Sequence, residues 1–271
     1  MKIQKIETRY GKMFVMISDQ VISKSLIEYG EWSHDEIQLL EQFIKPGMKV
    51  LDIGANVGSH TLAFSKATGL NGLVLSFEPQ PVVFGLLAVN MVENDATNVL
   101  VFNAAVGDAA GWLDLPHINY TKPNNYGAFR FGTFLVNNEK NINRTPIPVY
   151  RLDDLKLAES AHVIKIDVEG MEAAVLRGAR GLIAKSRPIM LIENETPGKE
   201  SEEMLSLLFE MEYDAYWQAG HIFEPNNFNK NKKNFFPNQA CMNVLALPRE
   251  SPVKINGKKV TDATEHPRKE T

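Results

Sequence analysis

The sequence predicts an α/β fold in which a mostly parallel β-sheet carries helices on both faces. From residue 49 onward, short apolar runs alternate with helix-period patterns, which is typical of this architecture. Seven runs have the length and composition of buried strands: 49–53, 73–77, 99–103, 163–167, 188–192, 213–217 and 242–247. With 271 residues, 44% of them hydrophobic, the chain is long enough to bury the core of one large domain.

Residues 1–46 are expected to form a small N-terminal cap. Two apolar strands are predicted there, Ile3–Thr8 and Met13–Ile17, and the chain turns between them at Gly11. An amphipathic helix follows, with Ser33 as its N-cap and acidic residues in its first turn. Pro46 is expected to end this helix.

The main domain is predicted to cover 47–250, with an insertion at about 116–145. Strand-like pieces at 112–115 and 146–151 flank the insertion. The insertion is too long and too polar to be a simple connection, so we expect it to face the substrate or to act as a lid. The polar, charged tail 251–271 is expected to be disordered.

Composition excludes several classes of protein. No apolar stretch approaches the roughly 18 residues that a membrane span needs, and the N-terminus lacks the apolar block of a signal peptide. We therefore expect a soluble, cytoplasmic protein. The formal net charge of -4 argues against a broad nucleic-acid-binding face. The single Cys241 excludes an internal disulfide and is expected to pack as a small hydrophobe.

A glycine turn follows the first strand of the predicted sheet and leads into a helix. Gly54 and Gly58 let the backbone bend sharply and approach a ligand, and the next helix points its N-terminal amides at that ligand. Asn56 and Ser59 belong to the same turn and are candidate binding residues. The glycines alone would equally suit a purely structural turn.

A glutamate at the end of the second strand favours a nucleoside pocket over a structural turn. Glu78 stands 24 residues beyond Gly54 and is followed by Pro79. A carboxylate in this position can accept hydrogen bonds from two ribose hydroxyls. We therefore expect Glu78 and Pro79 to contact the ligand.

Asp52 determines which nucleoside is expected. A dinucleotide site keeps its turn free of negative charge because a pyrophosphate sits there, and its usual spacing is G-x-G-x-x-G. This turn instead follows an aspartate, which suits a cationic ligand. S-adenosylmethionine carries a sulfonium and an ammonium but no phosphate, so Asp52 near its amino-acid end and Glu78 on its ribose are both electrostatically favourable.

A second group of acids follows the fourth and fifth predicted strands. Asp167, Glu169 and Glu172 come at or just after the end of the fourth strand, and Glu193 comes after the fifth. Ligands of open parallel sheets bind outside the carboxyl ends of the strands, so Asp167 should lie near the methyl donor and Glu193 on the same rim. Glu169 and Glu172 would also suit the N-terminus of the next helix.

Together these motifs resemble the FkbM family of S-adenosylmethionine-dependent methyltransferases. The resemblance runs from about Gly30 to Pro248, and the phrase Lys165-Ile166-Asp167-Val168-Glu169-Gly170-Met171-Glu172 is its most specific part. The matching segments are Asp52–Gly58, Phe77–Pro79, Asn103–Asp108, Arg151–Leu155, Ile164–Glu172 and Arg187–Glu193.

The resemblance implies a Rossmann-like class I methyltransferase fold, with sheet order 3-2-1-4-5-7-6 and an antiparallel last strand. It also implies O-methylation of a hydroxyl, often on a sugar or a glycosylated small molecule. Ala105 and Val106 would then lie near the adenine, with Asp108 close by.

Methyl transfer to a hydroxyl needs a group that aligns the acceptor and removes its proton. Asp167 is our candidate base, because burial would raise its proton affinity, and Glu193 adds a second acid to the site. His221, in the loop after the sixth strand, is an alternative base, whereas we expect His60 to be structural. A metal-assisted variant stays open, because Asp167 with Glu193-Asn194 would offer oxygen ligands to magnesium or calcium.

Three other readings stay open at this point. A nucleic-acid methyltransferase shares the donor site, but the usual Pro-Pro-aromatic clamp and Pro-Cys nucleophile are missing from this sequence. A non-catalytic donor-binding module would bind the same ligand without turnover. A nicotinamide oxidoreductase is disfavoured by Asp52.

Overall fold

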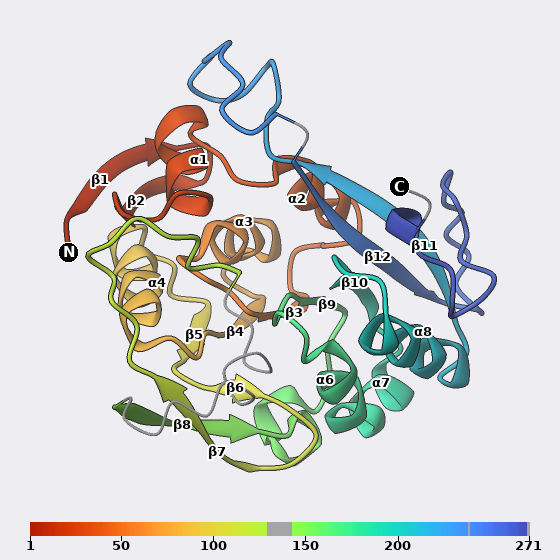
Figure 1. The fold of residues 1–271 in the computed structure, drawn as a ribbon. Coiled ribbons are helices and arrows are strands. Elements are labelled where there is room, and N and C mark those ends of the chain that lie inside the picture. The colour runs from red at the N-terminus through yellow and green to blue at the C-terminus, as the bar shows by residue number, and fades with distance from the viewer. Residues whose placement is uncertain (129–142, 238, 270–271) are drawn as a thin grey trace.

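The computed structural model describes residues 1–128, 143–237 and 239–269 (Figure 1). Its centre is a seven-stranded sheet with the order β5-β4-β3-β9-β10-β12-β11. The strands are β3 (Lys49–Ile53), β4 (Leu73–Phe77), β5 (Val99–Phe102), β9 (Val163–Ile166), β10 (Ile189–Glu193), β11 (Tyr213–His221) and β12 (Ala240–Pro248). Strand β12 runs antiparallel to both of its neighbours, β10 and β11, and all other pairs of neighbouring strands in this sheet are parallel. In chain order this is 3-2-1-4-5-7-6, which confirms the predicted fold.

Helices cover both faces of this sheet, so its central strands are buried on both sides. They are α3 (Ser59–Thr68), α4 (Pro81–Glu93), α6 (Glu172–Gly178), α7 (Arg180–Ser186) and α8 (Lys199–Glu210), with short 3₁₀ turns at Leu152–Asp154, Lys156–Ala158 and Pro267–Lys269. Successive residues of β3 pack against the helices on opposite faces of the sheet. Val50 belongs to a cluster with Phe64 of α3, whereas Leu51 belongs to a cluster with Leu176 of α6.

The N-terminal cap contains one helix more than the sequence analysis predicted. It consists of β1 (Ile3–Thr8), β2 (Gly11–Met16), α1 (Ile22–Tyr29) and α2 (His34–Glu41). The missed helix α1 buries Ile22, Leu26 and Tyr29, a spacing that does place them on one helical face. Ser33 occupies the N-cap position of α2, as predicted, but its side chain makes no capping hydrogen bond: its φ is 40°, and its hydroxyl lies 3.7 Å from the Cys241 sulfur. Helix α2 also ends before Pro46.

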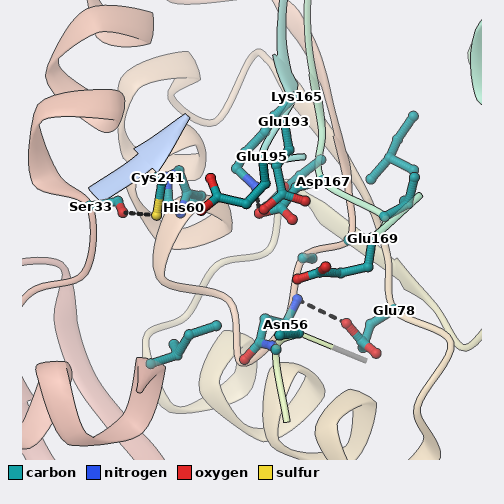
Figure 2. A pocket seen from close by; sticks show the side chains of 18 of the residues that line it. Ser33, Asn56, His60, Glu78, Lys165, Asp167, Glu169, Glu193, Glu195 and Cys241 are labelled. Atoms are coloured by element: carbon teal, nitrogen blue, oxygen red, sulfur yellow. Dashed lines mark hydrogen bonds and ion pairs between the residues drawn. The ribbon is translucent and has the colours of Figure 1, made fainter. Parts of the chain in front are cut away.

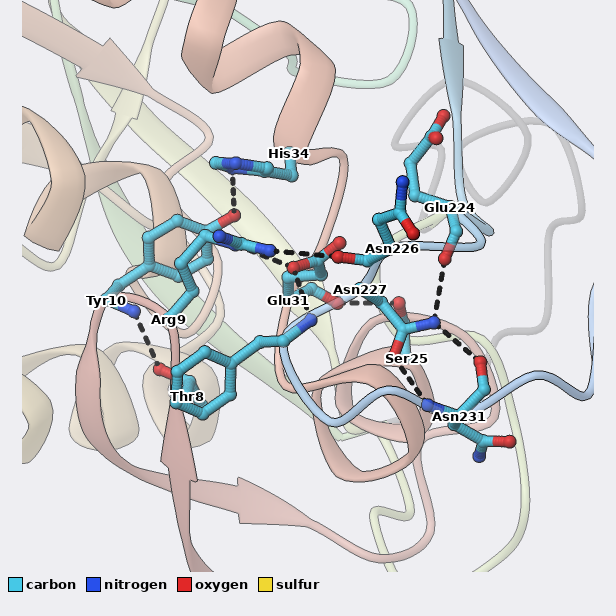
Figure 3. Close-up of polar contacts among 11 residues, drawn as sticks. Thr8, Arg9, Tyr10, Ser25, Glu31, His34, Glu224, Asn226, Asn227 and Asn231 are labelled. Carbon is cyan, nitrogen blue, oxygen red and sulfur yellow. Dashed lines mark hydrogen bonds and ion pairs between the residues drawn. The ribbon is translucent and has the colours of Figure 1, made fainter.

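The connection between β11 and β12 packs on this cap (Figure 3). The buried carboxylate of Glu31 pairs with Arg9 Nε at 2.7 Å and accepts the backbone N–H of Phe228 at 3.0 Å. The backbone N–H of Asn229 donates to Tyr29 O at 2.9 Å. Segments from the two ends of the chain are thereby held together above the carboxyl ends of the parallel strands.

A three-stranded sheet lies beside the main one and carries the insertion. It has the order β6-β8-β7, from β6 (Ala105–Val106), β7 (Gly111–Pro116) and β8 (Arg144–Tyr150), so both predicted flanking strands are present. Residues 129–142 of the insertion lie outside the described residues. The part before them is anchored by Tyr126, whose ring centroid is 4.9 Å from that of Tyr120 and whose carbonyl accepts a hydrogen bond from Gln80 Nε2 at 2.9 Å.

The tail differs from the expectation of disorder as far as residue 269. The backbone N–H of Trp217 donates to Lys258 O at 3.0 Å, and that of Val260 donates to Ala215 O at 2.8 Å. Val260 and His266 are buried. Strand β11 is an edge strand with unpaired backbone groups, and the polar tail satisfies some of them, which a composition-based prediction cannot detect. Among the described helices, none is long and apolar enough to span a bilayer.

Candidate functional site

A cavity of about 710 Å³ opens at the carboxyl ends of the parallel strands (Figure 2). Its floor comes from the ends of β3, β4, β9 and β10, and its walls come from the cap, the start of β12 and the tail. The position beside the central strands is where ligands bind in open α/β sheets, and the volume is in the range of small-molecule sites.

The two glycines of the turn have different tasks. Gly54 has a φ of 88° and lines the cavity, and a Cβ there would lie 1.7 Å from the carbonyl oxygen of Asp167. Gly58 has a φ of 92° but faces the side chains of Leu87 and Met91 of α4. Gly58 does not line the cavity, so its expected direct contact with the ligand is wrong: it lets α3 pack closely on α4.

Asp52 is buried beneath the turn and lines the cavity. One carboxylate oxygen, Oδ2, accepts a hydrogen bond from the Thr61 hydroxyl at 2.6 Å. The other, Oδ1, is buried without a hydrogen-bond partner among the described residues. Because an unsatisfied buried carboxylate oxygen is energetically unfavourable, this atom fits a cationic donor group supplied by a ligand.

Glu78 ends β4 on the same floor. Its Oε2 accepts the backbone N–H of Asn56 at 3.0 Å, and its Oε1 accepts that of Gln80 at 2.8 Å. Burial raises the pKa of this carboxyl group from 4.5 to about 7, although the two hydrogen bonds act in the opposite direction. Further predicted ligand-binding residues that line the cavity are Asn56, Ser59, Pro79, Ala105 and Val106. Asp108 is remote, since it is exposed and pairs with Arg177 at 3.0 Å.

Asp167 and Glu193 form an acidic pair with Lys165 beneath it. Lys165 Nζ lies 2.8 Å from Asp167 Oδ2. Burial alone would raise the pKa of Asp167, but the Lys165 ammonium and a hydrogen bond from Glu193 lower it below its ordinary value. Burial and the charge of Asp167 raise the pKa of Glu193 well above its ordinary value. Glu193 is therefore the more readily protonated member of the pair; burial does favour the protonated form of Asp167, as expected, but the Lys165 ammonium and the hydrogen bond from Glu193 outweigh it.

Lys165 was missed as a site residue, although the sequence contains the signal. Residues two apart on a strand point to the same face, so a lysine two positions before Asp167 is placed to pair with it. Lys165 is 4% exposed, and burial of an ammonium is favourable only beside carboxylates.

The predicted metal ligands are only partly brought together. Oxygen atoms of Asp167, Glu169 and Glu193 all lie within 4.8 Å of one another, with Glu169 at a φ of 52°. Asn194 does not line the cavity, and its side-chain nitrogen is buried without a partner among the described residues. The metal-assisted alternative therefore requires Glu169 in place of Asn194. Glu172 accepts the backbone N–H groups of Val168 and Gly170, as expected of an acid at a helix N-terminus.

His221 is not part of the cavity, which corrects its prediction as an alternative base. Strand β11 continues to this residue, and the register pairs it with Ala240. Its ring Nδ1 lies 3.4 Å from Asp35 Oδ2, and its backbone N–H donates to the same oxygen at 2.8 Å. The side chain is 61% exposed and points to the N-terminus of α2.

Several wall residues have no signal in the sequence. Segments distant along the chain supply Glu36, Cys241, Asn243 and Arg268 to the cavity. His60, which we expected to be structural, lines the cavity too. Arg268, from the tail, pairs with Glu195 at 2.5 Å and donates to the backbone carbonyl of Ala240 at 2.7 Å. These residues meet only because the cap, the β11–β12 connection and the tail converge on the cavity mouth.

Comparison with known protein families shows which family has this arrangement. The model of the FkbM methyltransferase domain matches residues 52–215, which is more than half of the chain. This chain belongs to the FkbM methyltransferase family. S-adenosylmethionine is the methyl donor of the FkbM family, in agreement with the donor inferred from Asp52 and Glu78.

Individual relatives of this FkbM protein are distant. It is 33% identical to protein-L-isoaspartate O-methyltransferase 1 of Arabidopsis thaliana over 82 residues, 29% of this chain and 36% of that enzyme. The FkbM methyltransferase structure from Methylobacillus flagellatus is 17% identical, with a TM-score of 0.44 over 78% of this chain and 50% of that one. The chain thus spans half or less of these two relatives. Fibrillarin of Aeropyrum pernix, solved with bound S-adenosylmethionine, is 13% identical, with a TM-score of 0.45 over 90% and 82% of the two chains.

Proposed function

We propose that this protein transfers a methyl group from S-adenosylmethionine to a hydroxyl group of a small, carbohydrate-like molecule. One observation carries the proposal: Asp52 and Glu78, at the ends of adjacent strands, share a cavity with the Asp167–Glu193 pair. A donor site and a polar group suited to an acceptor thus open into the same space.

The residues present fit the donor. The unpartnered Oδ1 of Asp52 suits its ammonium, Glu78 suits its ribose hydroxyls, and Gly54 leaves room where a Cβ would collide. Ala105 and Val106 offer an apolar surface for the adenine. When bound, S-adenosylmethionine supplies an electrophilic methyl group.

The acceptor side of the cavity favours hydroxyl groups. Asp167 is kept ionised by Lys165 and can accept a hydrogen bond from a hydroxyl, which holds the acceptor oxygen in place. Glu193, whose pKa is raised well above its ordinary value, adds a second carboxyl group beside Asp167. Glu169 and Glu195 add further carboxylates to the wall. A polyhydroxylated molecule offers several donors to such acceptors.

The same acidic wall argues against anionic acceptors. Phosphate groups of a nucleic acid and the carboxylate of an isoaspartyl residue would both meet the charges of Asp167, Glu169 and Glu195. Arg268 offsets only Glu195, with which it pairs. Of the activities considered, a hydroxyl acceptor is therefore favoured. We place the reaction in the cytoplasm, as the sequence predicted.

The proposal is tested in two steps. Calorimetric titration with S-adenosylhomocysteine should show saturable binding, and no binding at about 1 mM would overturn the donor assignment. Incubation with S-adenosylmethionine and a panel of methyl glycosides, nucleosides, isoaspartyl peptides and transfer RNA should then yield a methyl ether on a glycoside. Exclusive methylation of another class, or donor binding without any product, would replace the proposal with the corresponding alternative.

Asp167→Asn is the informative variant in the same assay. It should bind S-adenosylhomocysteine within about twofold of the wild type and lose most of its turnover, because the amide cannot align the acceptor as an ionised carboxylate does. Near-normal turnover would remove Asp167 from this role.

A further inference from the structure

A buried polar relay lies in the wall of the cavity, outside the acidic pair. Glu36 of the cap helix α2 is 6% exposed and His60 of α3 is 4% exposed, and both line the cavity. His60 Nε2 lies 3.4 Å from Glu36 Oε2, while Glu36 Oε1 accepts a hydrogen bond from Asn243 Nδ2 at 2.9 Å. Figure 2 shows His60 among the cavity-lining side chains, together with Cys241 and Ser33.

The surrounding structure makes room for this relay. A Cβ at Gly220 of β11 would lie 2.5 Å from Glu36 Oε1, so the strand has a glycine where the carboxylate enters. Asn243 is the register partner of Glu193, which places the relay next to the acidic pair. Burial of a carboxylate and an imidazole is unfavourable, and hydrophobic residues would stabilise this contact between the cap and the sheet better. The relay is therefore better explained by function than by stability.

The chemistry of the cavity leaves a task for such a group. Asp167 Oδ2 lies 2.8 Å from the Lys165 ammonium, so this carboxylate is already engaged by a cation and is better placed to hold the acceptor than to remove its proton. Histidine is the side chain best suited to accept a proton near neutral pH, and a carboxylate beside it typically fixes its tautomer. His60 Nε2 is buried without a hydrogen-bond partner among the described residues. Such contacts often tighten only when substrate binds.

We infer that His60 accepts the proton of the acceptor hydroxyl and that Glu36 positions the His60 ring. This inference rests on the proposed function. The titratable groups that interact with His60 are Glu36 of α2, at 3.4 Å, and, electrostatically, His34 of α2 and Asp167 at the end of β9. With the Nε2 proton directed to Glu36, Nδ1 keeps the lone pair that takes the hydroxyl proton.

Proton transfer to His60 accompanies methyl transfer to the acceptor oxygen. His60 receives the hydroxyl proton and becomes an imidazolium while the acceptor oxygen bonds to the methyl carbon and the carbon–sulfur bond of the donor breaks. The products are the methyl ether and the uncharged thioether S-adenosylhomocysteine. Glu36 stabilises the imidazolium until its proton passes to solvent.

The first test needs no acceptor. In ¹⁵N-histidine spectra with S-adenosylhomocysteine bound at about pH 8, His60, assigned with His60→Gln, should be neutral with its proton on Nε2, and Glu36→Gln should shift the tautomer populations. A proton on Nδ1, a charged ring at that pH, or a tautomer that does not respond to Glu36→Gln would overturn the inference.

The second test uses the glycoside that reacts in the acceptor panel. His60→Ala should keep its affinity for S-adenosylhomocysteine, which also shows that it folds, and lose about 100-fold in kcat. Added imidazole should restore part of this activity, and Glu36→Asp should retain more activity than Glu36→Gln. His162→Ala is the matched control and should behave as the wild type, because His162 precedes β9, at the end of the strand that lies away from Asp167 and the cavity.

The outcomes separate this inference from the proposed function. Normal turnover by His60→Ala, a loss without imidazole rescue, or loss of donor binding would each overturn the role of His60 while the methyltransferase assignment stands. Absence of donor binding or of glycoside methylation in the wild type would overturn both.

Discussion

Lys165 Nζ lies 2.8 Å from Asp167 Oδ2, on the same side of β9 and at the floor of the cavity. The contact places a permanent cation beneath the acid that was expected to act as the base. The ammonium lowers the pKa of Asp167, whereas burial and the charge of Asp167 raise the pKa of Glu193. Asp167 is therefore the ionised member of the pair, and Glu193 is the more readily protonated one.

Lys165→Met should make turnover strongly dependent on pH. Without the ammonium, burial and the neighbouring acids favour the protonated form of Asp167, so the pKa of Asp167 rises. We expect turnover of the reacting glycoside to fall at least tenfold at about pH 7 and to recover as the pH is raised. Lys66→Met removes an exposed lysine of α3 and serves as the control. A pH profile equal to that of the wild type would show that Lys165 does not govern Asp167.

Asp52→Asn should weaken binding of the donor. The amide can still contact the Thr61 hydroxyl, but the charge opposite the ligand ammonium is lost, so affinity for S-adenosylhomocysteine should fall by about 10-fold to 100-fold in calorimetry. Asp108→Asn changes an acid that is exposed and paired with Arg177, and it should leave affinity unchanged. Equal effects of the two substitutions would contradict the assignment of Asp52.

The free energy of unfolding of the ligand-free protein should depend on pH through the titration of Glu78. The folded state binds this proton more tightly than the unfolded chain, since the pKa of Glu78 rises from 4.5 to about 7. The contribution of Glu78 to the free energy of unfolding therefore falls as pH rises through this window, by about 3 kcal/mol in total. Denaturant unfolding of the wild type and Glu78→Gln across these pH values measures the difference. Parallel curves would contradict the shift.

Binding of the donor should show the opposite pH trend. Ribose hydroxyls bind the ionised carboxylate, so affinity for S-adenosylhomocysteine should rise as pH increases through about 7, and Glu78→Gln should abolish this rise.

Gly54→Ala should destabilise the protein and abolish donor binding. The added Cβ would lie 1.7 Å from the Asp167 carbonyl oxygen at a φ of 88°, so the turn must shift. We expect the free energy of unfolding to fall by at least about 2 kcal/mol. Gly85→Ala, within α4 and facing open space, should instead stabilise the protein by up to about 1 kcal/mol. Thermal unfolding of both variants tests the contrast, and tolerance of Gly54→Ala would show that the turn is not tightly held.

A chelator should not affect turnover. Asp167 already has the Lys165 ammonium as its cation, which reduces the attraction of the acidic cluster for a divalent ion. Turnover in about 1 mM EDTA should equal that without it. Inhibition that magnesium reverses would place a metal ion among Asp167, Glu169 and Glu193.

Local features of the chain accounted for the sheet and for the donor side of the site. Short buried runs predicted the first five strands of the sheet to within one residue, because a strand between two helical layers is mostly apolar. Asp52 and Glu78 were found because Asp52 lies near the end of one such run and Glu78 follows another, and the ends of neighbouring parallel strands meet at one edge. Helix α1 had a readable pattern and was overlooked.

The errors have a common physical origin in contacts between distant segments. The Ser33 hydroxyl contacts Cys241 instead of an amide of α2, and the His221 side chain lies beside Asp35 instead of in the cavity. The tail lies along β11 because that edge strand has unpaired backbone groups. None of these contacts leaves a periodic trace in the sequence.

The sequence by itself therefore determined the α/β fold and the two carboxylates expected to bind the donor, since these depend on periodicity and spacing along the chain, and the resemblance of its motifs indicated the family. Only the tertiary structure decided the rest. In the structure Gly58 and His221 lie outside the cavity, and Glu36 lies beside His60. The pKa of Glu193 is raised and that of Asp167 is lowered, so Glu193 is the more readily protonated member of the acidic pair. Electrostatic and hydrogen-bonding energies depend on distances through space, which the order of residues does not specify.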